Sequence, residues 1–283
     1  LPGDFLDYQG GECIPRSLRP LVAIPTTAGT GSEVTQFAMI KDHGAKAKLT
    51  YCSEALRPNV AILDPKTTLT APLKVTAASA MDAMTHAVEA IFAVNASEHT
   101  NALAIRAIQL IGENLPRAIE NPMDVEARGR LLVAANIAGI AFSQSGVGIV
   151  HACAHALGAL LGIPHGVANA LMLPHGIRFN GEGAAEKLAM ISSACQSATL
   201  NRSAGQPEGR TPQHQADGSD DPAVFMERLA RNAGIPSKLA DCGVKESDLG
   251  PLADYAANDG SLLFNPVPAD RDTLLTLFQR AYK

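Results

Sequence analysis

The sequence contains no tryptophan, and aromatic residues make up only 4% of its 283 positions. Charged residues are also scarce at 18%, and they leave a formal net charge of −5 without a block of lysine or arginine. Because phosphate backbones are bound by concentrated positive charge, this balance argues against nucleic acid as a partner. Apolar residues make up 46%, mostly aliphatic, and they indicate a globular protein with an alanine-rich core.

Long hydrophobic runs are missing as well. A membrane-spanning helix needs about 18 to 20 consecutive apolar residues. The longest candidate, residues 131–142, is shorter and contains Asn136, so it reads better as a buried helix. The first residues carry acidic groups and lack the charged-then-apolar pattern of a signal peptide. We therefore expect no membrane partner.

Cysteine is sparse and irregularly placed. The five cysteines are odd in number and form neither a disulfide framework nor a C-x-x-C metal knuckle. A reducing compartment fits this pattern, and we predict a cytoplasmic protein. The positions are Cys13, Cys52, Cys153, Cys195 and Cys242.

Short apolar runs bounded by turn residues predict strands only near the beginning of the chain. From Thr70 onward, apolar residues recur at helical spacing. We predict an α/β N-terminal part over residues 1–66 and an all-α domain over residues 67–283. Residues 201–222 are polar, rich in glycine and proline, and predict a surface loop. The predicted strands are 21–25, 37–40, 49–51 and 60–63, and the predicted helices are 77–94, 100–115, 125–142, 149–161, 225–233, 246–257 and 270–281.

Histidine is concentrated in two places. Asp82 and His86 are four residues apart on a predicted helix, which puts both side chains on one face, one turn apart. His151 and His155 repeat this spacing, and His165 follows at a predicted helix start. Such groups are costly to bury in apolar helices without partners. A shared divalent ion, Fe²⁺ or Zn²⁺ rather than Ca²⁺ or Mg²⁺, would satisfy them together. Spacing alone leaves open a surface hydrogen-bonded pair and satisfied core histidines.

Four segments carry a resemblance to a known family: AIPTTAGTGSEVT, PNVAILDP, MDAMTHAVEA and the long block HACAHALG…IPHGVANALMLPH. In this order they resemble the iron-containing (group III) alcohol dehydrogenases, over residues 4–198 and more weakly beyond. The resemblance implies a dehydroquinate synthase-like fold, a dinucleotide-binding domain followed by an all-α metal-binding domain. It also implies that Asp82, His86, His151 and His165 bind the metal, Fe²⁺ with Zn²⁺ as the alternative. His155 corresponds to a histidine near the metal that is not a permanent ligand.

The resemblance also implies a site for NAD or NADP. Glycines in the GTGS loop let the backbone approach a ligand, and threonine hydroxyls offer donors to phosphate or ribose, although a plain structural turn uses the same residues. Family members carry a GGGS-type pyrophosphate turn ahead of the region matched here, so we expect the Rossmann-like domain over 1–66 to be incomplete. The candidate cofactor residues are Thr26, Thr27, Gly29, Thr30, Gly31, Thr35, Phe37, Lys48, Thr67 and Thr70.

The function implied is reversible conversion of an alcohol into an aldehyde or ketone. The metal would act as a Lewis acid on the substrate oxygen, the nicotinamide would accept hydride, and His155 would relay the released proton. A small-molecule substrate and a homodimer or higher homo-oligomer are expected. Related metal-dependent polyol dehydrogenases, dehydroquinate synthase-like enzymes and maleylacetate reductases are alternatives, as is a metal-binding fragment without catalysis.

Overall fold

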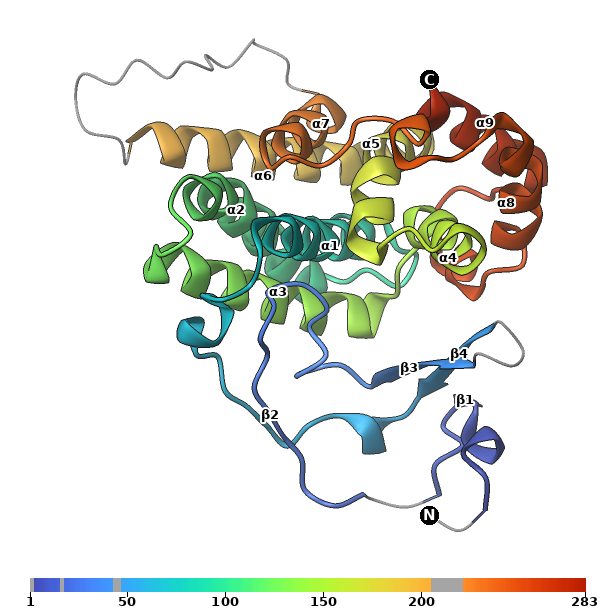
Figure 1. Cartoon of the computed structure of the whole chain (residues 1–283), viewed down its shortest axis with the longest axis horizontal. Helices are drawn as coiled ribbons and strands as arrows, with labels where there is room; N and C mark the ends of the chain where they lie inside the picture. Colours follow the sequence, from blue (N-terminus) through green and yellow to red (C-terminus); the bar gives the residue numbers. More distant parts are fainter. Residues whose placement is uncertain (1–2, 16–17, 43–46, 205–220) are drawn as a thin grey trace.

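The computed structural model describes residues 3–15, 18–42, 47–204 and 221–283, without the side chains of 41, 42, 47, 48 and 202–204. Within these ranges, short strands near the N-terminus lie below a larger body of helices (Figure 1). The helices are α1 (Leu73–Phe92), α2 (Glu98–Glu120), α3 (Val125–Ser145), α4 (Ile149–Leu161), α5 (His165–Gly183), α6 (Ala185–Ala204), α7 (Pro222–Asn232), α8 (Leu249–Ala256) and α9 (Arg271–Tyr282).

The strands form two small sheets. The parallel pair β2 and β5 places Val22 opposite Val60. In the other sheet β4 lies between β1, which is parallel to it, and β3, which is antiparallel. The strands are β1 (Gly10–Gly11), β2 (Val22–Ala23), β3 (Phe37–Asp42), β4 (Ala47–Cys52) and β5 (Val60–Ala61). The expected α/β part followed by an all-α part is confirmed.

Several predicted boundaries are wrong. α2 does not end at residue 115 but continues through Pro116 to Glu120, because an internal proline removes one hydrogen bond without always ending a helix. The first predicted strand pairs only at Val22 and Ala23. The predicted loop 201–222 begins with four residues that continue α6, and Pro222 already belongs to α7. Residues 205–220 lie outside the described part of the chain.

Helix α1 forms the centre of the helical body, packed by α2, α3, α4, α5 and α6. In Figure 1, α1 and α2 lie between α6 and α3. Every residue of α1 from Ala80 to Phe92 is buried. A helix surrounded on all sides needs apolar or small residues all round it, and alanine and methionine supply most of them here. Its three ionisable buried residues are therefore exceptional: Asp82, His86 and Glu89.

No single helix in the described ranges is long and apolar enough to cross a membrane. Helices α3 and α4 together have the length and composition of a span, but the chain bends by 104° between them.

Candidate metal centre

One face of α1 carries three ionisable groups in a row. Asp82, His86 and Glu89 are spaced by four and three residues, so they follow one another along the same side of the helix. They are 4%, 6% and 1% exposed. Burying polar groups this deeply is costly unless they have partners. The partners come from α4 and α5, which both pack against α1.

The first partner is His151, in the opening turn of α4. Its ring lies 4.8 Å from the ring of His86, nearly parallel to it. Its Nδ1 atom lies 2.6 Å from an oxygen of Glu89. The same carboxylate accepts the backbone N–H groups of Val150 and His151, at 2.6 and 3.3 Å. Glu89 therefore holds both the His151 ring and the start of α4.

Helix α5 contributes His165 and, one turn later, Asn169. The Nε2 atom of His165 lies 3.4 Å from Oδ1 of Asp82. The amide nitrogen of Asn169 lies 2.6 Å from the same Asp82 oxygen, and 3.2 Å from Nε2 of both His151 and His165. Oδ1 of Asp82 and the Nε2 atoms of His151 and His165 thus surround one amide group. Both histidines therefore direct Nε2 towards the side of the cluster where Asp82 lies.

Together these residues form a set of donors suited to a metal ion. Ligand atoms of Asp82, His86 and His151 lie within 4.8 Å of one another, and His165 approaches Asp82 from α5. The buried Nδ1 atom of His86 has no hydrogen-bond partner in the described part of the chain. One carboxylate and three imidazoles suit a borderline divalent ion such as Fe²⁺ or Zn²⁺. The residues present therefore fit a catalytic metal.

The electrostatics of the cluster match this chemistry. Burial lowers the pKa of His86 and of His151, the latter well below its ordinary value, so both imidazoles are neutral. Burial alone would raise the pKa of Asp82, but the nearby His86, His165 and His151 and the Asn169 amide lower it overall. Metal binding requires neutral imidazoles and an ionised carboxylate. The folded chain therefore holds Asp82, His86 and His151 in these states.

His155 lies beside the cluster, one turn after His151. Its ring stacks 5.5 Å from that of His165, and its Nδ1 atom lies 2.8 Å from Oδ2 of Asp259. Burial would raise the pKa of Asp259, but the hydrogen bond and charge of His155, with donors from Ser261, lower it to about 2. An ionised Asp259 accepts the Nδ1 proton, so the lone pair of the neutral His155 ring lies on Nε2.

A row of stacked rings links the cluster to the strands. Phe142 of α3 lies 4.1 Å from the ring of His86, and Phe37 of β3 lies 6.2 Å from Phe142, both nearly parallel. Phe37, a candidate cofactor residue, is therefore only one ring removed from a candidate ligand.

The GTGS loop fits closely against the helices. A Cβ atom at Gly29 would lie within 3.0 Å of Ser79 in α1, and one at Gly31 would lie 2.7 Å from the backbone of Gly139 in α3. Gly31 also has a φ of +60°, which favours glycine. Glu33 follows, buried, and accepts a hydrogen bond from Asn136 of α3 at 3.0 Å. The close approaches at Gly29 and Gly31 therefore place the loop directly against α1 and α3.

The other candidate cofactor residues occupy several environments. Thr26, Thr30 and Thr70 are exposed, whereas Thr35 is buried. The hydroxyl of Thr67 donates to the carbonyl groups of Pro25 and Asp64, so it braces the chain after β2. Lys48 lies in β4, and its side chain lies outside the described part of the structure.

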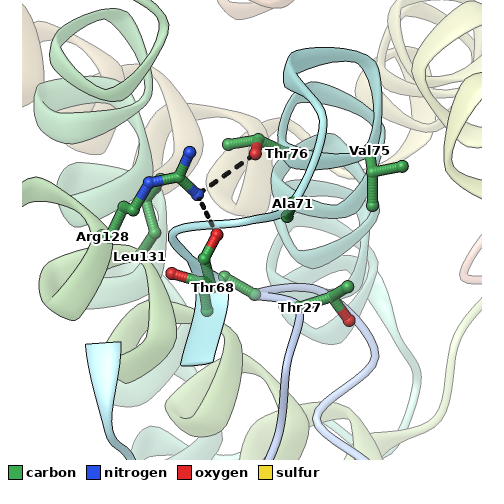
Figure 2. Close-up of a pocket in the computed structure, with 8 residues that line it drawn as sticks. Thr27, Thr68, Ala71, Val75, Thr76, Arg128 and Leu131 are labelled. Carbon is green, nitrogen blue, oxygen red and sulfur yellow. Dashed lines mark hydrogen bonds between the residues drawn. The ribbon is translucent and has the colours of Figure 1, made fainter. Parts of the chain in front are cut away.

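Thr27 lines a small pocket between the loop and the helices (Figure 2). Across this pocket Arg128 of α3 donates to the carbonyl oxygen of Thr68 and to the hydroxyl of Thr76. Arg128 is 2% exposed, and burial lowers its pKa. The guanidinium thereby joins α3 to the segment that leads into α1.

Comparison with known proteins identifies the family of this chain. The profile described as "Fe-containing alcohol dehydrogenase family, C-terminal" matches residues 76–282, and the profile "Iron-containing alcohol dehydrogenase" matches residues 3–65. This chain belongs to the iron-containing alcohol dehydrogenase family. As a member of that family, it is a metal-dependent oxidoreductase acting on alcohols and aldehydes.

Individual relatives cover nearly the whole chain. The 1,3-propanediol dehydrogenase of Klebsiella pneumoniae is 38% identical over 280 residues, and the NAD-dependent methanol dehydrogenase of Bacillus methanolicus is 37% identical over 279. Each alignment covers 99% of this chain and 70% of the relative. The crystal structure of a 1,3-propanediol oxidoreductase superposes with a TM-score of 0.88 at 37% identity, again covering 99% and 70%. This iron-containing alcohol dehydrogenase thus spans about 70% of the length of these relatives.

Sequence reasoning missed three residues of the site. Glu89 and Asn169 could have been found, because they continue the helical faces of His86 and His165 by three and four residues. Asp259 gave no signal, because it is 104 residues away from His155 in the chain.

Proposed function

We propose that Asp82, His86, His151 and His165 hold one divalent ion, Fe²⁺ with Zn²⁺ as the alternative, at which a small alcohol is oxidised reversibly. The observation that carries this proposal is the convergence of metal-compatible donors from α1, α4 and α5: three are buried together, and the partly exposed His165 approaches Asp82. When bound, such an ion supplies the Lewis acidity that lowers the pKa of a hydroxyl group or polarises a carbonyl.

The protein's own residues then orient the reactants and move the proton. Nε2 of His155 is placed to accept the proton released from the alcohol, because Asp259 occupies Nδ1. The side chain of His155 is 18% exposed, which gives this proton a route to water. The half-buried ring of Phe142 stacks on the ring of His86 and covers that face of the imidazole.

For the cofactor we propose a nicotinamide dinucleotide, with NAD favoured over NADP because one close relative is named as NAD-dependent. The residues proposed to contact it include the exposed Thr26 and Thr30 and the ring of Phe37. We infer that residues 1–66 carry cofactor contacts and residues 67–283 the metal. Short primary alcohols or diols are the proposed substrates, since the matched relatives are named for methanol and 1,3-propanediol. Assembly as a homo-oligomer stays a prediction for sedimentation analysis.

Metal content tests the ligand set. Protein purified without chelator is expected to carry about one ion per chain, measured by inductively coupled plasma mass spectrometry. Asp82→Ala and His165→Ala are each expected to lose most of it, together with NAD-linked oxidation of 1,3-propanediol. His99→Ala provides the matched control, because His99 is exposed on α2. Full occupancy in both ligand variants would refute the assignment.

A further inference from the structure

We propose that Glu89 is a positioning residue that fixes the tautomer of His151 and thereby sets the affinity of the metal site. This inference rests on the proposed ligand set, and it assigns a role to a residue outside that set. It begins from an arrangement in which one carboxylate from α1 meets both the backbone and the first histidine of α4.

The opening turn of α4 needs partners from elsewhere in the fold. The first N–H groups of a helix have no intrahelical acceptor, and the residue before α4 is Gly148, which has no side chain to cap them. Asn265 accepts the N–H of Ile149 at 3.1 Å, and Glu89 accepts those of Val150 and His151. Two side chains from distant elements therefore cap this helix.

Glu89 differs from Asn265 because it also reaches the imidazole. Glu89 already accepts two backbone N–H groups, and in its ionised form it can only accept hydrogen bonds, so the 2.6 Å contact then places the proton of His151 on Nδ1. Nε2 then keeps its lone pair, and this atom lies 3.2 Å from the Asn169 amide nitrogen, which also contacts Asp82 and His165. Carboxylate partners of this kind commonly orient metal-binding histidines. Because the carboxylate is fixed by the helix backbone, its orientation cannot easily adapt.

Glu89→Gln tests this role with almost no change in size. The amide has one acceptor and one donor end. If the donor faces His151, the imidazole proton moves to Nε2 and blocks the ligand atom. If the donor faces Val150 instead, two N–H groups oppose each other. Both arrangements penalise metal binding, and we expect Zn²⁺ affinity, measured by competition with a chelating dye, to fall 10- to 100-fold.

Asn265→Ala is the matched control, because it uncaps the same helix without touching His151. We expect a lower melting temperature but a Zn²⁺ dissociation constant within about threefold of the parent chain. An equal loss of affinity in this variant would reduce Glu89 to a helix cap and overturn the proposal. An unchanged affinity in Glu89→Gln would overturn it too.

The tautomer is measured directly by long-range ¹H–¹⁵N correlation on the metal-free chain at pH 8. The His151 signals are assigned by their absence in His151→Gln. We expect Nδ1 to be protonated in the parent chain, and a bare Nδ1 in the parent would refute the role of Glu89, whether or not the variant folds. If the parent chain binds no metal, the proposed function fails, while this spectrum still decides the role of Glu89.

Discussion

At the scale of single residues, the surroundings of each histidine decide what it can do. His151 is fully enclosed and has a carboxylate at one ring nitrogen. His155 has the same kind of partner but reaches solvent. His175, further along α5, is half-buried near the positive Arg178 instead. Histidine is therefore a candidate metal ligand at position 151, a candidate base at 155 and a group that stays neutral at 175.

His175 leads to a prediction about pH. Burial, with Arg178 and Arg280 and against Glu227, lowers the pKa of His175 from 6.5 to about 4. In the unfolded chain His175 is protonated below about pH 6.5, whereas in the folded chain it is protonated only below about pH 4. Its contribution to stability is thus complete above pH 6.5 and decreases as the pH falls.

From pH 7.5 to pH 5 this group should remove about 2 kcal/mol of unfolding free energy. His175→Gln is expected to lose that part of the pH dependence, as measured by urea unfolding at both values. His99→Gln, at an exposed position, should keep it. Parallel pH profiles for the parent chain and His175→Gln would contradict the prediction.

At the scale of elements, the site depends on how closely α5 approaches α1. A Cβ atom at Gly166, next to His165, would overlap the backbone carbonyl of Ala78 in α1. The missing side chain lets the first turn of α5 touch α1, which brings His165 to Asp82. A glycine at this contact is therefore required by packing rather than by its backbone angles.

Gly166→Ala should separate the two helices. We expect a loss of about 1 to 3 kcal/mol of unfolding free energy from overpacking, together with weaker metal binding. Gly129→Ala is the counterpart, because a Cβ atom there would meet Pro65 only at 3.6 Å, an ordinary contact. In the interior of α3 it should stabilise the chain by roughly 0.5 to 1 kcal/mol. The unfolding free energy of both variants is measured by chemical denaturation. An equal change in the two would show that the α1–α5 contact is not tight.

At the scale of the whole molecule, one buried arginine joins separate parts of the chain. Arg128 donates to the carbonyl groups of Pro122 and Thr68 and to the hydroxyl of Thr76. These bonds connect the turn before α3, the segment after β5 and the first turn of α1. Figure 2 shows the bonds to Thr68 and Thr76. The same segment braces the chain beside Thr26 through the hydroxyl of Thr67.

Arg128→Ala should therefore weaken the fold well beyond its local environment. Losing three hydrogen bonds to a charged group, with buried carbonyls left unpaired, is expected to cost at least about 3 kcal/mol in urea unfolding. Arg130→Ala changes an exposed arginine two residues away and should alter stability by less than about 0.5 kcal/mol. A small effect of Arg128→Ala would mean that water replaces the guanidinium without loss.

The sequence by itself determined which side chains share a helix face. Asp82 and His86, like His151 and His155, lie on common faces because side chains four residues apart recur after one turn. The same local rule, applied further, would have included Glu89 and Asn169. The family was recognisable from its motifs, and the fold class followed from the change in hydrophobic period after residue 66.

Only the tertiary structure decided which faces meet. The contact between Glu89 and His151 depends on where α4 starts beside α1, and that between Asp259 and His155 joins residues 104 positions apart. Helix crossings are fixed by steric fit, as at Gly166 and Ala78, and not by local periodicity. For this reason the candidate ligands could be named from spacing and resemblance, whereas the groups that orient them came from the packed fold.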